Sequence, residues 1–277
     1  MATIPGYVKV IGGKTPARDR RSARTDRLSP VAALVRRHDR DRFQTVLFAP
    51  AAHREALFAL YAFNYEIASV RERVSEPTLG RIRLEWWRET IAAAYEDGPV
   101  RSHIVVEALT DAIRGHGLTR EHFDRLIDAR ERDLDDEARA SLIALEDYAD
   151  ASSARLIYLA LEMLGVPDLA ARQAARHVGI AYGLAGLLRA MPYQARASRP
   201  LVPAEIAAAA SRHLVLARGL RSAVARAAIP ALLPAIVAER YLRRLKRAGC
   251  DPFDKAVTAP DPLQSWRFAA AALVNRF

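Results

Sequence analysis

The sequence predicts an all-α protein, and three observations support this fold class. Hydrophobic residues make up 51% of the 277 residues, whereas glycine occurs only 13 times. Alanine and leucine are common, and the alternation of apolar and polar residues that marks a half-buried strand is almost absent. Prolines and Gly-Pro pairs divide the chain into segments whose apolar residues recur every three or four positions, as on one face of a helix. We therefore expect a single helical bundle with a sizeable core.

The helices can be placed in order from these breaks. A proline disfavours the α conformation in the residue before it and is favoured in the first turn, so Pro77 ends one helix and opens the next. Thr119 is a candidate N-cap for a helix whose apolar stripe runs to Leu134. About ten helices are expected, at approximately 30–37, 51–75, 77–97, 99–114, 119–134, 145–165, 167–189, 204–210, 217–246 (with proline interruptions) and 262–277.

The N-terminal segment differs from the rest of the chain. Residues 1–28 are rich in arginine and lack an apolar core for export, so we expect a basic, disordered tail followed by one helical domain over residues 29–277. The chain contains no run of about twenty apolar residues, and a transmembrane helix is not expected. The single cysteine, Cys250, excludes an intramolecular disulfide framework and favours a reducing compartment.

The charge is strongly positive, with a formal net value of +10 and a pI of about 10.1. Such a balance suggests an anionic partner, which includes nucleic acid, an acidic protein and a lipid surface. The arginines are interleaved with acids, and no nucleic-acid-binding motif or aromatic–basic pattern is present. We therefore expect no nucleic acid partner, and an anionic membrane surface remains a candidate.

The stretch from Tyr61 to Glu72 organises the functional interpretation. Tyr61, Asn64 and Ala68 share one helical stripe that carries little charge, and the segment from Gly183 to Arg189 has the same property. Because Gly183 and Gly186 carry no side chain, neighbouring helices must either close in on them or leave a cavity.

These stretches belong to a series of motifs that resembles the squalene/phytoene synthase family over about residues 38–255. The matching motifs, in order, are YAF at 61–63, LIDARERDLDD at 126–136, SSA at 152–154 and GLAGLLRAMPYQARASRPLVP at 183–203. The resemblance implies an isoprenoid-synthase helical bundle with a central cavity. It also places the following residues along that cavity: Tyr61, Asn64, Tyr65, Gly183, Gly186 and Arg189.

The aspartate motifs of that family are missing here. Members usually carry YAFCR-x-x-DD-x-x-D and QL-x-NILRD-x-x-x-D on facing helices, because ionising a prenyl diphosphate requires Mg²⁺ held between opposing carboxylates. In this chain Ala68 and Ser69 stand at the paired aspartates, and Glu72 stands at the last position of the first motif. Ala190 and Gln194 replace both aspartates of the second motif. One carboxylate of five remains, so we expect no metal, no cofactor and no catalytic residue.

Two other groups of residues have the chemistry of a site but not its pattern. Asp124 with Asp128, and Asp133 with Glu137, are spaced four apart, but arginines surround them as on a solvated helix face. No histidine has metal-ligand spacing, and all six beyond residue 50 are interpreted as surface or helix-end residues: His53, His103, His116, His122, His177 and His213. Arg189 would be costly to bury unpaired, and we expect Glu66 or Glu72 as its partner.

Further blocks, including FNYEIASVRERVSEPTLGRIRLEWWRETI and YADASSARLIYLALEMLG, resemble a non-catalytic branch of the same family that assists assembly of respiratory complex I. The resemblance implies a scaffold that binds a complex I subunit or assembly intermediate, with an anionic membrane surface or an isoprenoid lipid as a further partner. It implies a cytoplasmic, membrane-peripheral location in a bacterium, or the matrix side of the inner membrane in a eukaryote. The alternative is a divergent prenyl transferase that acts on prenyl diphosphates with Mg²⁺.

Overall fold

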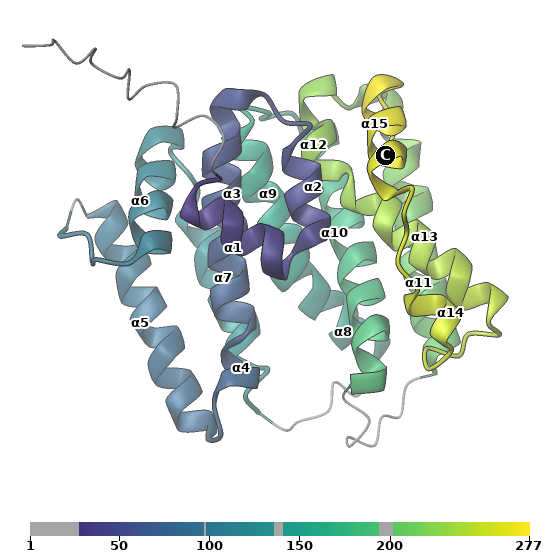
Figure 1. Ribbon diagram of the computed structural model, residues 1–277, viewed down its shortest axis with the longest axis horizontal. Helices are drawn as coiled ribbons and strands as arrows, with labels where there is room; N and C mark the ends of the chain where they lie inside the picture. The colour runs from purple at the N-terminus through teal and green to yellow at the C-terminus, as the bar shows by residue number, and fades with distance from the viewer. Residues whose placement is uncertain (1–27, 97, 136–140, 194–201) are drawn as a thin grey trace, which may run out of the picture.

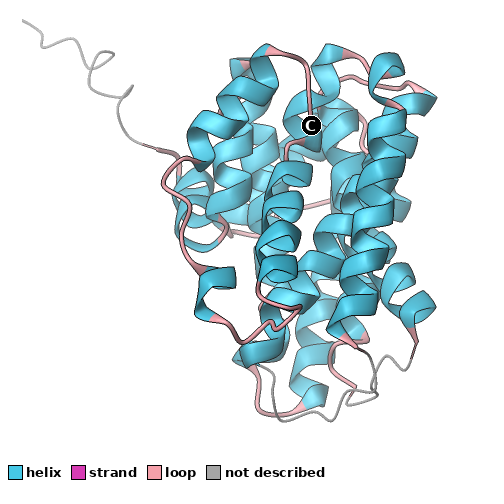
Figure 2. Ribbon diagram, turned by 90° about the vertical axis from the view of Figure 1, so that its right-hand side faces the viewer, coloured by secondary structure: helices cyan, strands magenta, loops and turns pink. Residues whose placement is uncertain are grey.

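The computed structural model describes residues 28–96, 98–135, 141–193 and 202–277, and in this part of the chain every regular element is a helix (Figures 1 and 2). The predicted all-α fold is therefore confirmed. The α-helices are α1 (Pro30–His38), α2 (Arg40–Val46), α3 (Ala51–Ala68), α4 (Val70–Arg73), α5 (Pro77–Tyr95), α6 (Ile104–His116), α7 (Arg120–Glu131), α8 (Leu142–Ala149), α9 (Arg155–Met163), α10 (Leu169–Ala190), α11 (Pro203–Gly219), α12 (Ile229–Leu232), α13 (Pro234–Arg247), α14 (Lys255–Thr258) and α15 (Gln264–Leu273). A π-helix, η2 (Asp150–Ala154), joins α8 to α9.

Helix α10 lies at the centre of the bundle. It packs against α11, α13, α9, α8 and η2, and its buried residues are mostly alanine or other small and apolar side chains. Small residues allow neighbouring helix backbones to approach closely, so one helix can contact several others. Helix α3 is nearly as long and packs against α1, α6 and α9, with Leu60, Ala62 and Phe63 fully buried. These two helices carry the segments in which the family's aspartates are missing, here called the vacated motifs.

Several helix ends follow from local sequence. The side chain of Ser29 accepts a hydrogen bond from the Ala32 amide at 3.1 Å, and Asp168 accepts one from Ala171 at 2.7 Å. Such N-caps satisfy amide groups that have no partner inside the helix. Gly117 adopts φ 60° after α6, a left-handed conformation that glycine reaches at little cost, and the helix ends there.

Some predicted boundaries were wrong. Helix α3 ends at Ala68 instead of near residue 75, because Ser69 forms a break before the short α4. Helix α6 begins at Ile104, five residues after the proline at which it was expected to start, and the region around 145–165 contains the π-helix rather than one continuous α-helix. Helix α2 was not predicted, since its first turn lies in a polar cluster that resembles a loop.

No helix in the described ranges is long and apolar enough to cross a membrane. The predicted basic tail lies outside the described residues, apart from Leu28, which is 41% exposed.

Candidate functional site

The vacated motif positions lie at the ends of the two central helices. Ala68 is the last residue of α3, and Ala190 is the last residue of α10. The Ser69 hydroxyl donates a hydrogen bond to the carbonyl of Glu66 at 3.2 Å, so it completes the end of the helix. Glu72 is exposed on α4, beyond the break. Gln194 lies outside the described residues.

This arrangement does not fit a Mg²⁺ cluster. Alanine offers no ligand atom, and the one carboxylate of the set, Glu72, points to solvent from a separate short helix. Within the described ranges, no three His, Cys, Asp or Glu side chains are grouped so that they could hold a metal ion. The described motif positions thus offer one carboxylate, Glu72, where ionisation of a prenyl diphosphate uses several oxygen ligands around Mg²⁺.

An arginine occupies the space between the two motif helices. The Arg42 guanidinium, from α2, lies 5.6 Å from the ring centroid of Tyr61 on α3 and 4.9 Å from that of Tyr182 on α10. Arg42 is only 9% exposed, and its Nη1 forms an ion pair with Asp39 at 2.6 Å. Burial raises the pKa of Tyr61 to about 12, against the opposing effect of Arg42, so Tyr61 stays neutral at physiological pH.

A guanidinium between two phenol rings is a stable arrangement, because the faces of aromatic rings attract cations and the buried charge is compensated by Asp39. Arg42 was not singled out from the sequence. The signal that could have identified it is the cluster His38-Asp39-Arg40-Asp41-Arg42, in which Asp39 is both the N-cap of α2 and the partner of Arg42.

Arg189 is paired with Asp41, and the predicted partners Glu66 and Glu72 were wrong. The Arg189 Nη1 lies 3.3 Å from the Asp41 Oδ2. Glu66 instead forms an ion pair with Arg73 at 2.9 Å, and Glu72 is exposed beyond the break at Ser69. The correct partner lies 148 positions away in sequence, on a helix that was not predicted.

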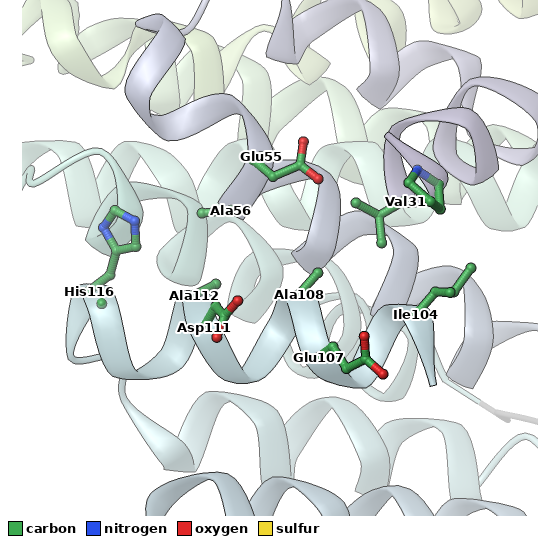
Figure 3. Close-up of a pocket in the computed structure, with 11 residues that line it drawn as sticks. Val31, Glu55, Ala56, Ile104, Glu107, Ala108, Asp111, Ala112 and His116 are labelled. Carbon is green, nitrogen blue, oxygen red and sulfur yellow. The ribbon is translucent and has the colours of Figure 1, made fainter. Parts of the chain in front are cut away.

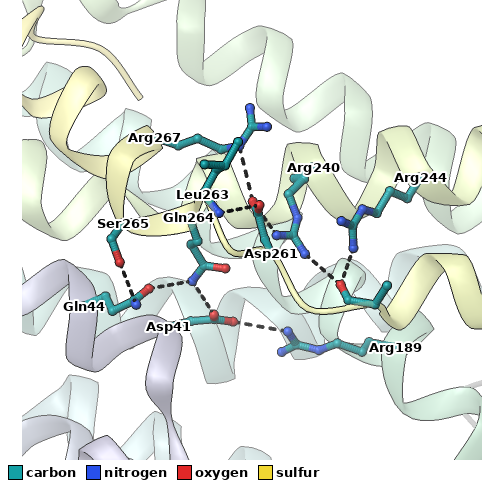
Figure 4. Close-up of polar contacts among 11 residues, drawn as sticks. Asp41, Gln44, Arg189, Arg240, Arg244, Asp261, Leu263, Gln264, Ser265 and Arg267 are labelled. Carbon is teal, nitrogen blue, oxygen red and sulfur yellow. Dashed lines mark hydrogen bonds and ion pairs between the residues drawn. The ribbon is translucent and has the colours of Figure 1, made fainter.

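Asp41 also connects this site to the C-terminal helix (Figure 4). The Gln264 amide donates to the Asp41 Oδ1 at 2.7 Å and to the Gln44 Oε1 at 3.0 Å. The Gln44 amide in turn donates to the Ser265 hydroxyl at 3.0 Å. Asp261, with a side chain only 5% exposed, forms ion pairs with Arg240 at 2.5 Å and Arg267 at 3.3 Å. Polar contacts thus join α2, α10, α13 and α15.

The two glycines of the second motif, Gly183 and Gly186, differ in how closely a neighbouring helix approaches them. A Cβ atom at Gly183 would lie 2.8 Å from the Ala149 Cβ, so α8 approaches the helix closely there. At Gly186 an added Cβ would meet nothing within 4 Å.

Two further residues predicted to line the site lie near the first motif. Asn64 is buried, and its Oδ1 accepts no hydrogen bond from the described residues. The Tyr65 ring stacks on the His38 ring, with 4.1 Å between the ring centroids.

The described acidic residues spaced four apart on and after α7 are paired with arginine. Asp128 lies 3.0 Å from Arg88, and Asp133 lies 3.3 Å from Arg130. The Tyr148 hydroxyl donates to Asp133 at 2.8 Å and accepts a bond from Arg130 at 2.6 Å. These partners make the carboxylates part of ion-pair networks. Glu137 lies outside the described residues.

His122, interpreted as a surface or helix-end residue, lies in the first turn of α7 and is buried there. It is 3% exposed, and its Nε2 lies 3.6 Å from the Glu162 Oε1. Burial lowers the pKa of His122 below its ordinary value of 6.5, partly opposed by Glu162. His122 follows the polar residues Arg120 and Glu121 at this helix end, and it is buried because it faces the same side of α7 as Leu126.

The sequence matches the model of the squalene/phytoene synthase family over residues 35–210. Among curated relatives, the NADH dehydrogenase (ubiquinone) complex I assembly factor 6 of Bos taurus is 33% identical, covering 84% of this chain and 80% of the relative. The homologue of Drosophila melanogaster is 32% identical, over 88% of this chain and 83% of the relative. A presqualene diphosphate synthase of Rhodopseudomonas palustris is 30% identical but covers only 57% of this chain and 56% of that protein.

Two solved structures have the same fold. The squalene synthase HpnC from Alicyclobacillus acidocaldarius aligns with a TM-score of 0.71 and 20% identity, covering 80% of this chain and 94% of the other. A dehydrosqualene synthase in complex with ligand aligns with a TM-score of 0.75 and 13% identity, covering 88% and 94%. The helical bundle is therefore the one that these synthases share.

Proposed function

Because the chain belongs to the squalene/phytoene synthase family but lacks that family's aspartate ligands, we propose that it is a non-catalytic member that assists the assembly of respiratory complex I. The names of relatives that match at 32–34% identity over most of their length support this role. In this role the protein holds a complex I subunit or assembly intermediate on its surface and transforms no prenyl diphosphate.

The observation that carries this proposal is the position of Arg42. A buried guanidinium, paired with Asp39 and held between Tyr61 and Tyr182, lies between the two helices that carry the vacated motifs. A catalytic site of this family would need carboxylates and divalent metal there, and a fixed cation repels a metal ion. Arg189, held by Asp41, supports the same conclusion from the end of α10.

We propose further that the protein acts at an anionic membrane surface, through the outer face of α15. Apolar side chains line the solvent side of this helix and its flanks, with exposures of 54% for Leu263, 74% for Trp266, 76% for Leu273 and 59% for Val274. Successive members of this set are three, seven and one positions apart in the sequence, which places them on one stripe of the helix. The buried Phe268 and Ala271 lie on the other side. A stripe of this kind beside arginines is typical of a helix that lies in a membrane interface.

The proposed location follows from the role. In a bacterium the protein would be cytoplasmic and membrane-peripheral, and in a eukaryote it would lie on the matrix side of the inner mitochondrial membrane. An isoprenoid lipid is a further candidate ligand of the bundle, since the fold is shared with synthases that handle such chains.

A deletion strain tests the assembly role. Deleting the gene is expected to lower membrane NADH:quinone oxidoreductase activity and leave squalene and carotenoid levels unchanged. Complementation with the wild-type chain restores the activity. The Ala68→Asp variant, which adds back one motif carboxylate, is expected to complement as well as the wild type when it is equally abundant. Normal respiration with depleted polyprenoids would contradict the proposal.

A biochemical assay tests the enzymatic alternative, which the partial match to a presqualene diphosphate synthase favours. Purified protein with farnesyl diphosphate and Mg²⁺ is expected to release no pyrophosphate above a protein-free control. Metal-dependent release that is abolished by substituting Tyr61 or Asn64 would establish an active prenyl transferase.

A further inference from the structure

A groove with a volume of about 440 Å³ lies between α1, α3 and α6, on the outside of the bundle (Figure 3). Its floor is apolar and includes Val31, Ala56, Ala108 and Ala112, and the exposed Ile104 lies at one end. None of the motif positions lines this groove, so it is separate from the site described above.

The rim of the groove is acidic. Glu55 comes from α3 on one side, and Glu107 and Asp111 come from α6 on the other, as Figure 3 shows. All three carboxylates are exposed, and none of them has an ion pair or hydrogen bond with another described residue. This contrasts with Glu66, Asp41, Asp128 and Asp133, each of which is paired with an arginine.

The first described residues of the chain lie beside this groove. Pro30 and Val31, in the first turn of α1, are among the lining residues. Residues 1–27 precede them and are strongly cationic, with seven basic residues against Asp19 and Asp26. The basic residues are Lys9, Lys14, Arg18, Arg20, Arg21, Arg24 and Arg27.

The dimensions agree with occupancy by this segment. The 13 residues of α6 extend over roughly 20 Å at about 1.5 Å per residue. An extended chain covers about 3.3 Å per residue, so fewer than ten residues upstream of Pro30 are enough to traverse the groove. Arg21, Arg24 and Arg27 all lie within that distance. A tether this short keeps the local concentration of the segment high, on the order of millimolar.

We propose that residues 1–27 of the same chain bind in this groove, with arginines on the carboxylates of Glu55, Glu107 and Asp111. The segment is complementary in charge, is attached at the groove, and is long enough to fill it. Anionic lipid and nucleic acid would be repelled by the same three carboxylates. The bound segment would be withheld from any anionic surface, so groove and membrane compete for it. This inference does not depend on the proposed role in complex I assembly.

Limited trypsin digestion of the full-length protein tests the inference, because the segment contains cleavage sites after five arginines, at positions 18, 20, 21, 24 and 27. Cleavage within residues 1–27 is followed by intact mass spectrometry. The groove variant Glu55→Gln/Glu107→Gln/Asp111→Asn is expected to be cleaved about tenfold faster than the wild type at low salt, since three tethered ion pairs are lost. The difference is expected to vanish at about 0.5 M salt, where the screening length is only a few ångströms.

A matched variant separates a local contact from a general change in charge. Glu72→Gln/Glu96→Gln/Glu205→Gln removes the same number of exposed carboxylates elsewhere and is expected to be cleaved like the wild type. A charge exchange provides the converse test. Glu107→Lys/Asp111→Lys should expose the segment, and adding Arg24→Glu/Arg27→Glu should restore protection at Arg18, Arg20 and Arg21.

Three results would overturn the proposal. Equal cleavage rates for the wild type and the groove variant would show that residues 1–27 do not bind in the groove. A basic segment of another protein would then be the candidate ligand. Acceleration in the matched variant would show that only overall charge matters. Failure of the charge exchange to restore protection, in a protein with wild-type circular dichroism and thermal midpoint, would exclude direct pairing.

Discussion

Gly179 of α10 packs directly against the backbone of Ala154 in η2, so closely that a methyl group at Gly179 would overlap that backbone. Backbone atoms cannot move aside as a flexible side chain can. Gly179→Ala is therefore expected to destabilise the protein by about 1–3 kcal/mol. Chemical denaturation at equilibrium measures this change in the free energy of unfolding.

Gly186, two turns along the same helix, supplies the control. An added Cβ atom there meets nothing within 4 Å, so Gly186→Ala is expected to be neutral or to stabilise by about 0.5–1 kcal/mol, because alanine restricts the unfolded chain. Equal destabilisation by both substitutions would contradict the assigned close approach of η2.

The ion pair between Arg42 and Asp39 can be tested without removing the N-cap of α2. Asn is as good an N-cap as Asp, so Asp39→Asn keeps the hydrogen bond from the Arg42 amide and removes only the charge. A buried arginine without its partner costs about 3–5 kcal/mol, and a loss of that order is expected for Asp39→Asn. Asp39→Ala, which also removes the cap, is expected to cost about 1 kcal/mol more. A loss below about 1 kcal/mol for Asp39→Asn would mean that Arg42 is solvated rather than buried.

His122 makes the stability of the fold dependent on pH. Burial lowers its pKa below 6.5, so above that value the histidine is neutral in both folded and unfolded chains. As the pH falls below 6.5, the unfolded chain binds a proton first, and the free energy of unfolding decreases until the folded pKa is reached. The decrease from this one group is at most about 1.4 kcal/mol per pH unit. Arg155 and Arg172 add to the lowering of the pKa, and Glu121 and Glu162 oppose it.

Urea denaturation between pH 7.5 and 5.5 measures this dependence. The His122→Gln variant is expected to lose part of the slope, because glutamine does not titrate. An unchanged slope would show that other groups account for the acid sensitivity; burial also lowers the pKa values of His177 and His213, whose Nδ1 atoms lie 2.9 Å apart.

The outer face of α15 predicts binding to anionic vesicles. Trp266→Ser/Leu273→Ser removes the two most exposed large apolar side chains of the helix. Each contributes about 1.5–3 kcal/mol when fully buried, so vesicle partitioning is expected to fall at least tenfold. Sedimentation with vesicles that contain an anionic phospholipid measures the effect.

Leu169 provides a matched control for that experiment. Leu169 is the first residue of α10, and it is 70% exposed. The polar contacts to α15 involve Arg189, which lies at the other end of this 22-residue helix, so Leu169 is far from α15. Leu169→Ser is expected to bind vesicles like the wild type. An equal loss of binding for Leu169→Ser, or no vesicle binding by the wild type, would contradict the proposal that α15 binds the membrane.

The periodic segments of the sequence predicted most of the helices. Prolines and glycines fix where several helices start and stop by local geometry, and Pro77, Pro203 and Gly117 lie at helix ends as this rule requires. The break at Ser69 could not be predicted in the same way, because no proline or glycine marks it. The π-helix at 150–154 was equally hidden, since its residues are compatible with an ordinary α-helix.

The identity of the site residues was harder to predict than the fold. The missing aspartates at positions 68, 69 and 190 can be read directly, because the motifs that surround them are local. The partner of Arg189 depends on a tertiary contact across 148 positions, and spacing within one helix carries no information about it. Arg42 was hidden for a related reason: an arginine in a polar cluster is usually exposed, and only packing against two tyrosines makes it internal.

The position of Arg42 limits what a single substitution could build at this place. One carboxylate added beside an internal guanidinium does not by itself make a metal site. A carboxylate restored near the site would be neutralised by the resident arginine as an ion pair, which favours the fold without creating a metal site. Removing Arg42 first would leave Asp39 without its partner. A metal site here would therefore require several coordinated substitutions, and the present side chains favour the fold over metal binding.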